Sequence, residues 1–216
     1  MSQPYDRGAQ VAQPGTLDHS LGEWWVENPW DISSMGKNLS AYERKRCFLN
    51  VRGPDGDRAF LDISYLTGTD NDGDGRSVVA GDFRNTGRQD LVLRMVGGGP
   101  VKIYENYFPQ QHYLEVTLRG TRSNRQGIGA RLIARVKGRQ LVRELFPYDS
   151  YRSQAPNIVH FGLGKDEQID QLEIHWPSGE VQKLARVQAD RHVVIEEGKT
   201  GAGAVEVVVP GRTIRP

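Results

Sequence analysis

The sequence predicts an all-β fold, and three observations lead to this prediction. Short runs rich in Val, Leu and Ile alternate with polar residues at the period of two that half-buried strands require. The 25 glycines and 11 prolines among 216 residues are ordinary for a chain of many turns and high for a helical one. A clear helix start occurs only at Ser40 to Glu43, where a capping box predicts one short helix as far as Arg46.

The composition excludes several classes of protein. With 28 basic and 27 acidic side chains the chain is nearly neutral, so its overall charge points neither to nucleic acid nor to a membrane. The single cysteine, Cys47, excludes an internal disulfide framework and a cysteine-rich zinc site. No apolar run approaches the roughly 18 to 20 residues of a transmembrane helix. No secretory signal is visible at the N-terminus, which leaves a cytoplasmic location open.

Residues 1–37 have no sustained hydrophobic period and predict an extended N-terminal arm. The arm holds Trp24, Trp25 and Trp30, three of the four tryptophans. An exposed tryptophan is costly, because each ring can bury on the order of 150 to 250 Å². The three rings therefore either pin the arm to the protein's own core or dock onto a partner protein or a lipid interface.

Residues 38–108 predict the short helix followed by a small β unit with closely spaced strands. The predicted strands are Cys47 to Val51, Ala59 to Tyr65, Ser77 to Asp82, Asp90 to Met95, and Val101 to Glu105. Two aspartate-bearing loops lie among them, because Gly and Asp supply turn conformations that Val and Leu cannot.

The aspartate loops are candidate calcium sites. Asp70, Asp72 and Asp74 stand two apart before a glycine, a spacing that lets their side chains converge on one hard cation. In the second loop, Asp82 and Asp90 take the first and ninth positions, but Arg84 and Thr86 stand where further oxygen ligands are expected. The alternative is that these carboxylates only accept hydrogen bonds from loop N–H groups.

This stretch resembles the FG-GAP repeat of integrin-alpha-type propellers, which reads roughly Asp-x-Asp-x-Asp-Gly-x-x-Asp-Leu. One such unit, or one and a half, is visible, and a lone blade cannot close a ring. It is therefore expected to bury its apolar face on the domain that follows or on another protein.

Residues 109–198 predict a second, larger β domain, an antiparallel sandwich or distorted barrel, and residues 199–216 a C-terminal tail or strand. Its predicted strands are Tyr113 to Arg119, Ala130 to Lys137, Gln140 to Phe146, Asn157 to Phe161, Ile169 to Trp176, Val181 to Leu184, and His192 to Glu196.

Four landmarks occur in order in this domain: Gly120 to Ala130, Tyr151 to Gln154, His160 to Gly164, and Trp176 to Gly179. Together they resemble the ASPIC/UnbV domain, which follows FG-GAP repeats in the cartilage acidic protein family. The resemblance implies an extracytoplasmic (periplasmic or cell-surface), calcium-associated interaction module, and it implies no established reaction.

A basic stretch without Asp or Glu runs from Arg119 to Arg143. In a strand from Ala130, side chains two apart share a face, so Arg131, Arg135 and Lys137 are expected on the same side. This face is either paired with carboxylates from elsewhere in the fold or free to dock onto an anionic partner, such as lipid head groups or an acidic protein face. Nucleic acid is disfavoured because no stacking aromatics are interleaved.

Catalytic patterns are weak. Ser153, His160 and Asp149 lack the Gly-x-Ser-x-Gly elbow of a hydrolase, and a hydrogen-bonded structural histidine explains His160 better.

The sequence leaves two hypotheses for the function. The first is a non-catalytic interaction module, an accessory subunit of a larger assembly, either soluble or membrane-associated, with weak calcium binding. The second is an enzyme or carbohydrate-binding protein whose site lies at the seam between the blade and the sandwich. An exposed aromatic groove with a perturbed carboxylate would favour the second hypothesis, and an arm that extends away from the core would favour the first.

Overall fold

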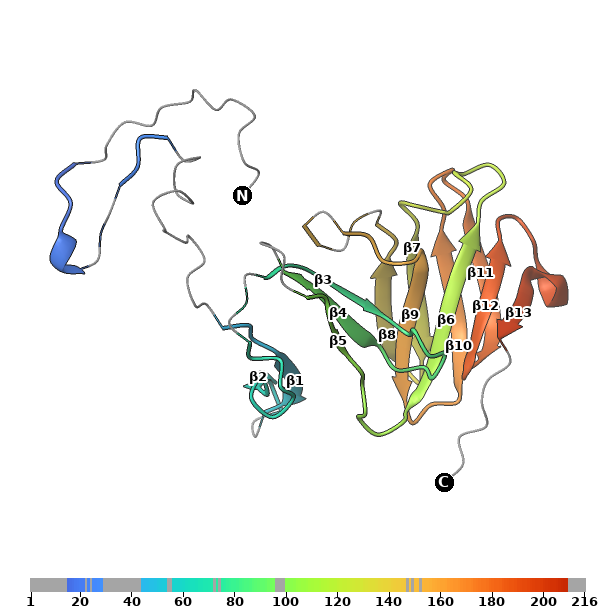
Figure 1. The fold of residues 1–216 in the computed structure, drawn as a ribbon. Helices are drawn as coiled ribbons and strands as arrows, with labels where there is room; N and C mark the ends of the chain where they lie inside the picture. The colour runs from blue at the N-terminus through green and yellow to red at the C-terminus, as the bar shows by residue number, and fades with distance from the viewer. Residues whose placement is uncertain are drawn as a thin grey trace. The chain divides into compact units, whose positions relative to one another are not determined.

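A computed structural model describes residues 15–21, 23, 25–28, 44–53, 56–71, 73, 75–95, 100–146, 148, 150–151 and 153–209. Strands make up nearly all of the secondary structure, which confirms the all-β prediction (Figure 1). The chain divides into two compact units, Met1–Asp74 and Gly75–Pro216, each of which is described by itself. Within the described residues no helix is both long and apolar enough to cross a membrane.

In its described residues, the first unit has one turn of 3-10 helix, η1 (His19–Leu21), and an antiparallel hairpin of β1 (Phe48–Arg52) and β2 (Arg58–Asp62). One face of the hairpin is aliphatic, because Leu49 pairs with Leu61 and Val51 pairs with Ala59. The predicted helix from Ser40 lies mostly outside the described residues. Its last predicted turn, Arg44 to Arg46, is not helical.

The second unit is built on two four-stranded sheets. The first has the order β11 (Val181–Gln188), β10 (Gln168–His175), β7 (Arg131–Val136) and β8 (Arg139–Glu144), and all its pairs are antiparallel. The second has the order β13 (Val205–Val209), β12 (Arg191–Glu196), β6 (His112–Arg119) and β9 (Ile158–Gly164). A short 3-10 helix, η3 (Gly201–Ala204), precedes β13.

The second sheet departs from the antiparallel prediction at one pair, because β12 runs parallel to β6. Parallel neighbours need a long crossover connection, and the chain from β7 to β11 supplies it. The alternation of apolar and polar residues is the same for either direction of a strand, so the sequence pattern could not have shown this pairing.

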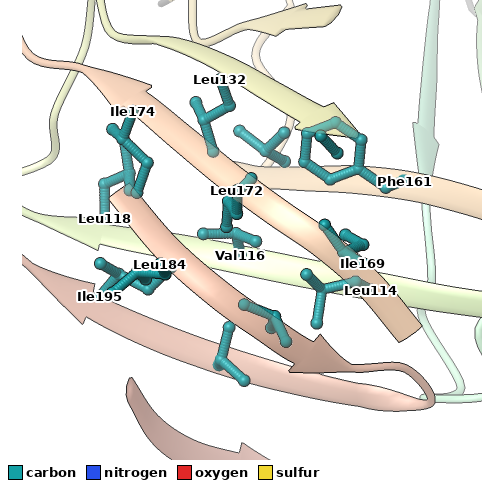
Figure 2. Packing of buried hydrophobic residues seen from close by; sticks show 14 of the residues in the cluster. Leu114, Val116, Leu118, Leu132, Phe161, Ile169, Leu172, Ile174, Leu184 and Ile195 are labelled. Atoms are coloured by element: carbon teal, nitrogen blue, oxygen red, sulfur yellow. The ribbon is translucent and has the colours of Figure 1, made fainter. Parts of the chain in front are cut away.

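The hydrophobic core lies between these two sheets. Leu114, Val116 and Leu118 alternate along β6 and meet Leu172 and Ile174 of β10, and all five are almost completely buried (Figure 2). Burial of aliphatic side chains of this size stabilises the fold by roughly 1.5 to 3 kcal/mol each. The sandwich is therefore the most strongly stabilised part of the described chain.

A third sheet in this unit has the order β3 (Gly75–Gly81), β4 (Asp90–Met95) and β5 (Lys102–Tyr104). The predicted small β unit of residues 38–108 is thus divided. Its first two strands belong to the first compact unit, and its last three belong to the unit of the sandwich.

Candidate functional site

An open pocket of about 480 Å³ lies where the three-stranded sheet meets the sandwich, and we call it the seam pocket. Val78, Ala80 and Leu91 of β3 and β4 line one side. The remaining lining residues are Gly81, Asp82, Phe83, Asn85, Gln89, Glu115, Arg143, Glu144, Leu145, Phe146, Ala155, Pro156, Ile158, Val159 and His160. Its volume is within the range of small-ligand sites, and its walls are mostly apolar with a few polar groups.

Glu115 is the most unusual residue of the seam pocket. Its position between Leu114 and Val116 directs its side chain away from the core, toward the side of β6 that the three-stranded sheet covers. The residue is only 5% exposed, and its carboxyl group has no hydrogen bond or ion pair to any described residue. Burial, and then the negative charge of Asp82, raise the pKa of Glu115 to about 7.

His160 lies directly across the strand pair from Glu115. Its ring stacks on Tyr113 with centroids 6.0 Å apart, and its Nε2 donates to the Gly87 carbonyl at 3.0 Å. Burial lowers the pKa of His160, which keeps the ring neutral at pH 7. These contacts support the interpretation of His160 as a structural histidine.

Gly87 brings the second aspartate loop against the sandwich. Its φ is 81°, and a Cβ placed on it would lie 2.1 Å from Cδ1 of Tyr113. Only glycine has both the backbone freedom and the small size for this position. The loop that the sequence suggested as a calcium site is therefore a packing element.

Both carboxylates of this loop are engaged within the protein. Oδ1 of Asp82 accepts from the Thr86 N–H at 2.9 Å, and Oδ2 accepts from the Gly87 N–H. Asp90 is almost fully buried and receives Arg84 Nη2 at 3.0 Å and Nε at 3.3 Å. Burial acts to raise the pKa of Asp90, but the bonds from Arg84 and the Asn106 N–H outweigh it and hold the pKa below its usual range.

These residues do not fit a calcium ion, because the guanidinium of Arg84 already supplies the positive charge at Asp90. A calcium ion takes six to eight oxygen ligands, and here the oxygens accept from N–H donors. Across the part of the chain that the structure describes, no three His, Cys, Asp or Glu side chains gather closely enough to hold a metal.

The first aspartate loop is described only in part. Asp70 accepts from Arg44 Nη2 at 2.8 Å, whereas Asp72 and Asp74 lie outside the described residues. Calcium binding by this loop stays a prediction.

The predicted basic face is largely paired. Arg135 donates to Glu173 at 3.0 Å, and Lys137 pairs with Asp166 at 2.8 Å, whereas Arg131 is 3.9 Å from Glu144. β7 ends at Val136, so Lys137 is in the turn, with φ 45°, and does not share a strand face with Arg131 and Arg135. Docking of an anionic partner on these residues stays a prediction.

Glu173 is the centre of that paired face. It accepts from His175 Nε2 at 2.6 Å, and Lys183 approaches it to 3.5 Å. The hydrogen bonds from His175 and Arg135 lower the pKa of Glu173 to about 2.

The two arginines of β8 cover the edge strand β9 of the other sheet. β9 ends its sheet, and Arg143 Nε donates to the His160 carbonyl at 3.1 Å while Arg139 Nη2 reaches the Leu163 carbonyl at 3.4 Å. Arg143 also lies over the ring of Phe161, 5.7 Å from its centroid. Charged groups on an edge strand hinder pairing with another chain.

Glu197 is a buried carboxylate that sequence reasoning missed. Its Oε2 accepts from the N–H groups of Thr121, Arg122 and Ser123, each at 2.8 Å, and its Oε1 accepts from the Ser123 and Ser178 hydroxyls. Burial acts to raise the pKa of Glu197, but bonds from Ser123 and Ser178 outweigh it, so the pKa lies well below its usual range. Nothing in its sequence context, an acid after a strand, signals this role.

Two of the four landmarks, Gly120 to Ala130 and Trp176 to Gly179, form local structure of the sandwich. Asn124 Oδ1 accepts from the Ile128 N–H at 2.9 Å, and its amide donates to the Ile128 carbonyl at 2.7 Å. Gly127 has φ 68°, and a Cβ there would lie 2.7 Å from Leu118 Cβ. Trp176 is buried and donates to Gln182 at 2.8 Å. These residues build local structure of the sandwich.

The remaining candidates can be placed only in part. Trp25 is half-buried, while Trp24, Trp30 and Asp149 lie outside the described residues. Ser153 Oγ is buried without a hydrogen-bond partner among the described residues, and His160 bonds to Gly87 instead of to Ser153.

The second unit is a two-sheet β-sandwich with a small third sheet packed beside it and a pocket where they meet. Residues 120–202, from the loop before β7 to η3, match the family model described as ASPIC and UnbV. No curated protein matches the chain. The match begins after the aspartate loops, so the resemblance to FG-GAP repeats and to the cartilage acidic protein family stays a prediction.

Proposed function

We propose that this protein is a non-catalytic binding module that holds a segment of a partner protein in the seam pocket and acts as an accessory subunit of a larger assembly. The observation that carries the proposal is the carboxyl group of Glu115, buried at an open pocket with no partner among the described residues. Burying a polar group without a partner costs free energy, and such groups concentrate at functional sites.

The geometry around the pocket favours an extended segment. Among the described residues β3 is an edge strand that pairs only with β4, and its Val78 and Ala80 line the pocket. The Val78 N–H donates to Ser150 Oγ at 3.4 Å, a long hydrogen bond that an added strand would replace. An extended peptide can add to such an edge through main-chain hydrogen bonds, while neighbouring pockets receive its side chains. The apolar walls then contribute the burial that stabilises the complex.

The alternative function, an enzyme or a carbohydrate binder, would use the same pocket, and the raised pKa of the Glu115 carboxyl group is one feature expected of it. Hydrolysis of a glycosidic bond needs two carboxyl groups that can both reach the substrate. Both oxygens of Asp82 already accept hydrogen bonds from its own loop, and the ring of His160 is bonded to Gly87. This arrangement favours binding over catalysis.

Calcium binding at Asp70, Asp72 and Asp74 and a place outside the cytoplasm belong to the same proposal. Their support is the spacing of the aspartates and the resemblance to extracytoplasmic modules.

Filling the pocket tests the proposal. Partners captured from the source cells are purified and titrated against the wild type, Ala80→Phe in the pocket, and the control Arg94→Phe on the opposite face of the same sheet. We expect Ala80→Phe to weaken binding at least about 10-fold, or about 1.4 kcal/mol, and the control to bind normally. Equal binding by both variants, with both cooperatively folded, would contradict the proposal.

A further inference from the structure

We infer that Glu115 receives a protonated primary amine on an apolar stem, such as a lysine side chain, and that binding of the amine expels the proton of Glu115. The inference rests on the proposed function, because it names the group that enters the seam pocket. It stands on three features of the pocket: a buried carboxyl group, a second carboxylate beside it, and apolar walls.

Among the described residues, the charged and titratable groups around Glu115 supply no cation to it. Asp82, from the loop packed on this face, is itself an acid. On either side of β6, Glu115 has a histidine as its strand neighbour, His160 on β9 and His192 on β12. Burial lowers the pKa values of both histidines. His192 Nε2 is 2.8 Å from Thr117 Oγ1, to which it is hydrogen-bonded.

The basic residue of the pocket is also engaged elsewhere. Arg143 donates to the His160 carbonyl and to the Val142 carbonyl and lies over Phe161. Glu144, the last acid of the lining, has Arg131 at 3.9 Å. The described lining thus has three acids and one arginine, and the guanidinium of this arginine donates to backbone carbonyls.

A cation entering such a pocket is attracted by both carboxylates. An opposite charge within about 4 to 6 Å favours the ionised form of a carboxyl group, so the amine draws Glu115 into its charged form. The proton then passes from the Glu115 carboxyl group to solvent, and an ammonium–carboxylate pair remains in the pocket.

The lining of the pocket favours an alkyl ammonium over a metal ion. Long cationic side chains bury their methylene stems along apolar surface while the charged head finds a polar partner, and Val78, Leu91 and Ile158 supply such a surface. A calcium ion would need six or more oxygen ligands, whereas both oxygens of Asp82 already accept N–H groups.

The test uses four small probes on the full chain. Nα-acetyl-lysine methylamide represents a partner's side chain and n-butylamine a free amine, while Nα-acetyl-norleucine methylamide and n-butanol are their uncharged counterparts. Binding is followed by calorimetry and by chemical shifts of β3 and β9 from pH 5.5 to 8.5. Calcium chloride is titrated in parallel.

We expect amine affinity to rise by up to about 10-fold per pH unit below pH 7 and to level off above it, because the bound state holds fewer protons. The uncharged probes should bind at least 10-fold more weakly. Calorimetry in two buffers should show release of close to one proton near pH 6. Glu115→Gln, which keeps the side-chain shape, should remove the pH dependence and weaken amine binding at least 10-fold.

Tighter binding of the lysine derivative than of butylamine identifies a partner's side chain as the source, and the reverse identifies a free amine. The inference is overturned if no amine binds, if amines and uncharged probes bind alike, if affinity does not rise with pH, or if calcium takes the site and excludes the amine. If Ala80→Phe weakens partner binding but no amine binds the wild type, only this inference is overturned. If amines bind but Ala80→Phe leaves partner binding unchanged, only the proposed function is overturned.

Discussion

Glu197 contributes to the fold by gathering a loop rather than by pairing with a cation. Three consecutive N–H groups and two hydroxyls converge on one buried carboxylate, which connects the loop after β6 to the Trp176–Gly179 turn. Hydrogen bonds to a charged acceptor are about twice as strong as neutral ones, and a buried donor that loses its acceptor is costly.

Glu197→Ala should therefore lower the free energy of unfolding by about 3 kcal/mol or more, since several buried donors lose their acceptor. Because folding depresses the pKa of Glu197, its contribution is fully present above the unfolded pKa of about 4.3 and is lost as the pH falls below it. Urea denaturation at pH 7 and at pH 3.5 measures both effects.

Glu206→Ala is the matched control, because Glu206 is an exposed acid 3.8 Å from Arg119 and should change stability by less than about 1 kcal/mol. Similar losses for both variants, or a loss at Glu197 that does not shrink in acid, would show that the carboxylate is not the organising group.

Among the elements, the loop from Asp82 to Asp90 shows how a calcium-like pattern can serve packing. Asp82 holds the loop N–H groups, Arg84 neutralises Asp90, and Gly87 allows contact with Tyr113 and His160. An internal guanidinium and a close backbone contact replace the metal that the spacing suggested.

Gly87→Ala should destabilise the protein by roughly 2 to 5 kcal/mol, because a left-handed alanine and an overfilled contact with Tyr113 both cost free energy. Gly164→Ala separates the two causes. Gly164 also has positive φ, at 69°, but a Cβ at this position would have no heavy atom within 4 Å, so only the backbone cost of about 1 to 2 kcal/mol is expected. Thermal unfolding of both variants decides whether the close approach matters.

The first aspartate loop is the remaining calcium candidate. If it binds calcium at the weak affinity of extracellular modules, a dissociation constant near 0.1 mM and 2 mM calcium give about 1.8 kcal/mol of added stability. Titration of chelated protein should show a heat of binding that is absent in the triple variant Asp70→Asn, Asp72→Asn, Asp74→Asn and retained in Asp57→Asn. The absence of both a heat and a rise in Tm for the wild type would end the calcium proposal.

Across the whole molecule, stability is concentrated in the second unit. The main hydrophobic cluster extends from Leu114 to Ala204, whereas the described part of the first unit buries few large apolar side chains and exposes Phe48, Phe60 and Leu61. A lone two-stranded hairpin is marginally stable in water, so its apolar side chains are candidates for further contacts.

Deleting residues 1–36 should leave cooperative unfolding and the far-UV β signature intact, because the cluster lies outside the arm. On the docking interpretation of the tryptophans, the same deletion weakens association with the native partner. Aggregation or loss of cooperative unfolding after the deletion would instead place the tryptophans in the protein's own core. Circular dichroism and calorimetry distinguish these outcomes.

Much of the fold could be predicted from the sequence, because local alternation determines which residues form strands. The predicted and observed limits of β4 coincide, and those of β6 and β12 differ by one residue. The turn at Lys137 and Gly138 was harder to predict. Both residues have positive φ, a conformation that the sequence indicates for glycine but not for lysine. The parallel pairing of β12 with β6 left no mark in either strand.

The order of residues was enough to establish the all-β class, the ASPIC/UnbV landmarks and the face on which each side chain of β6 lies. It placed Glu115 on the polar face of a half-buried strand, where an acid is ordinarily solvated. The three-dimensional packing alone revealed that the three-stranded sheet and its loop cover this face, since Gly87 brings the loop from Asp82 to Asp90 against Tyr113. Periodicity reports the side of a strand and not what packs on that side, so an acid expected at the surface is the buried carboxyl group of a pocket.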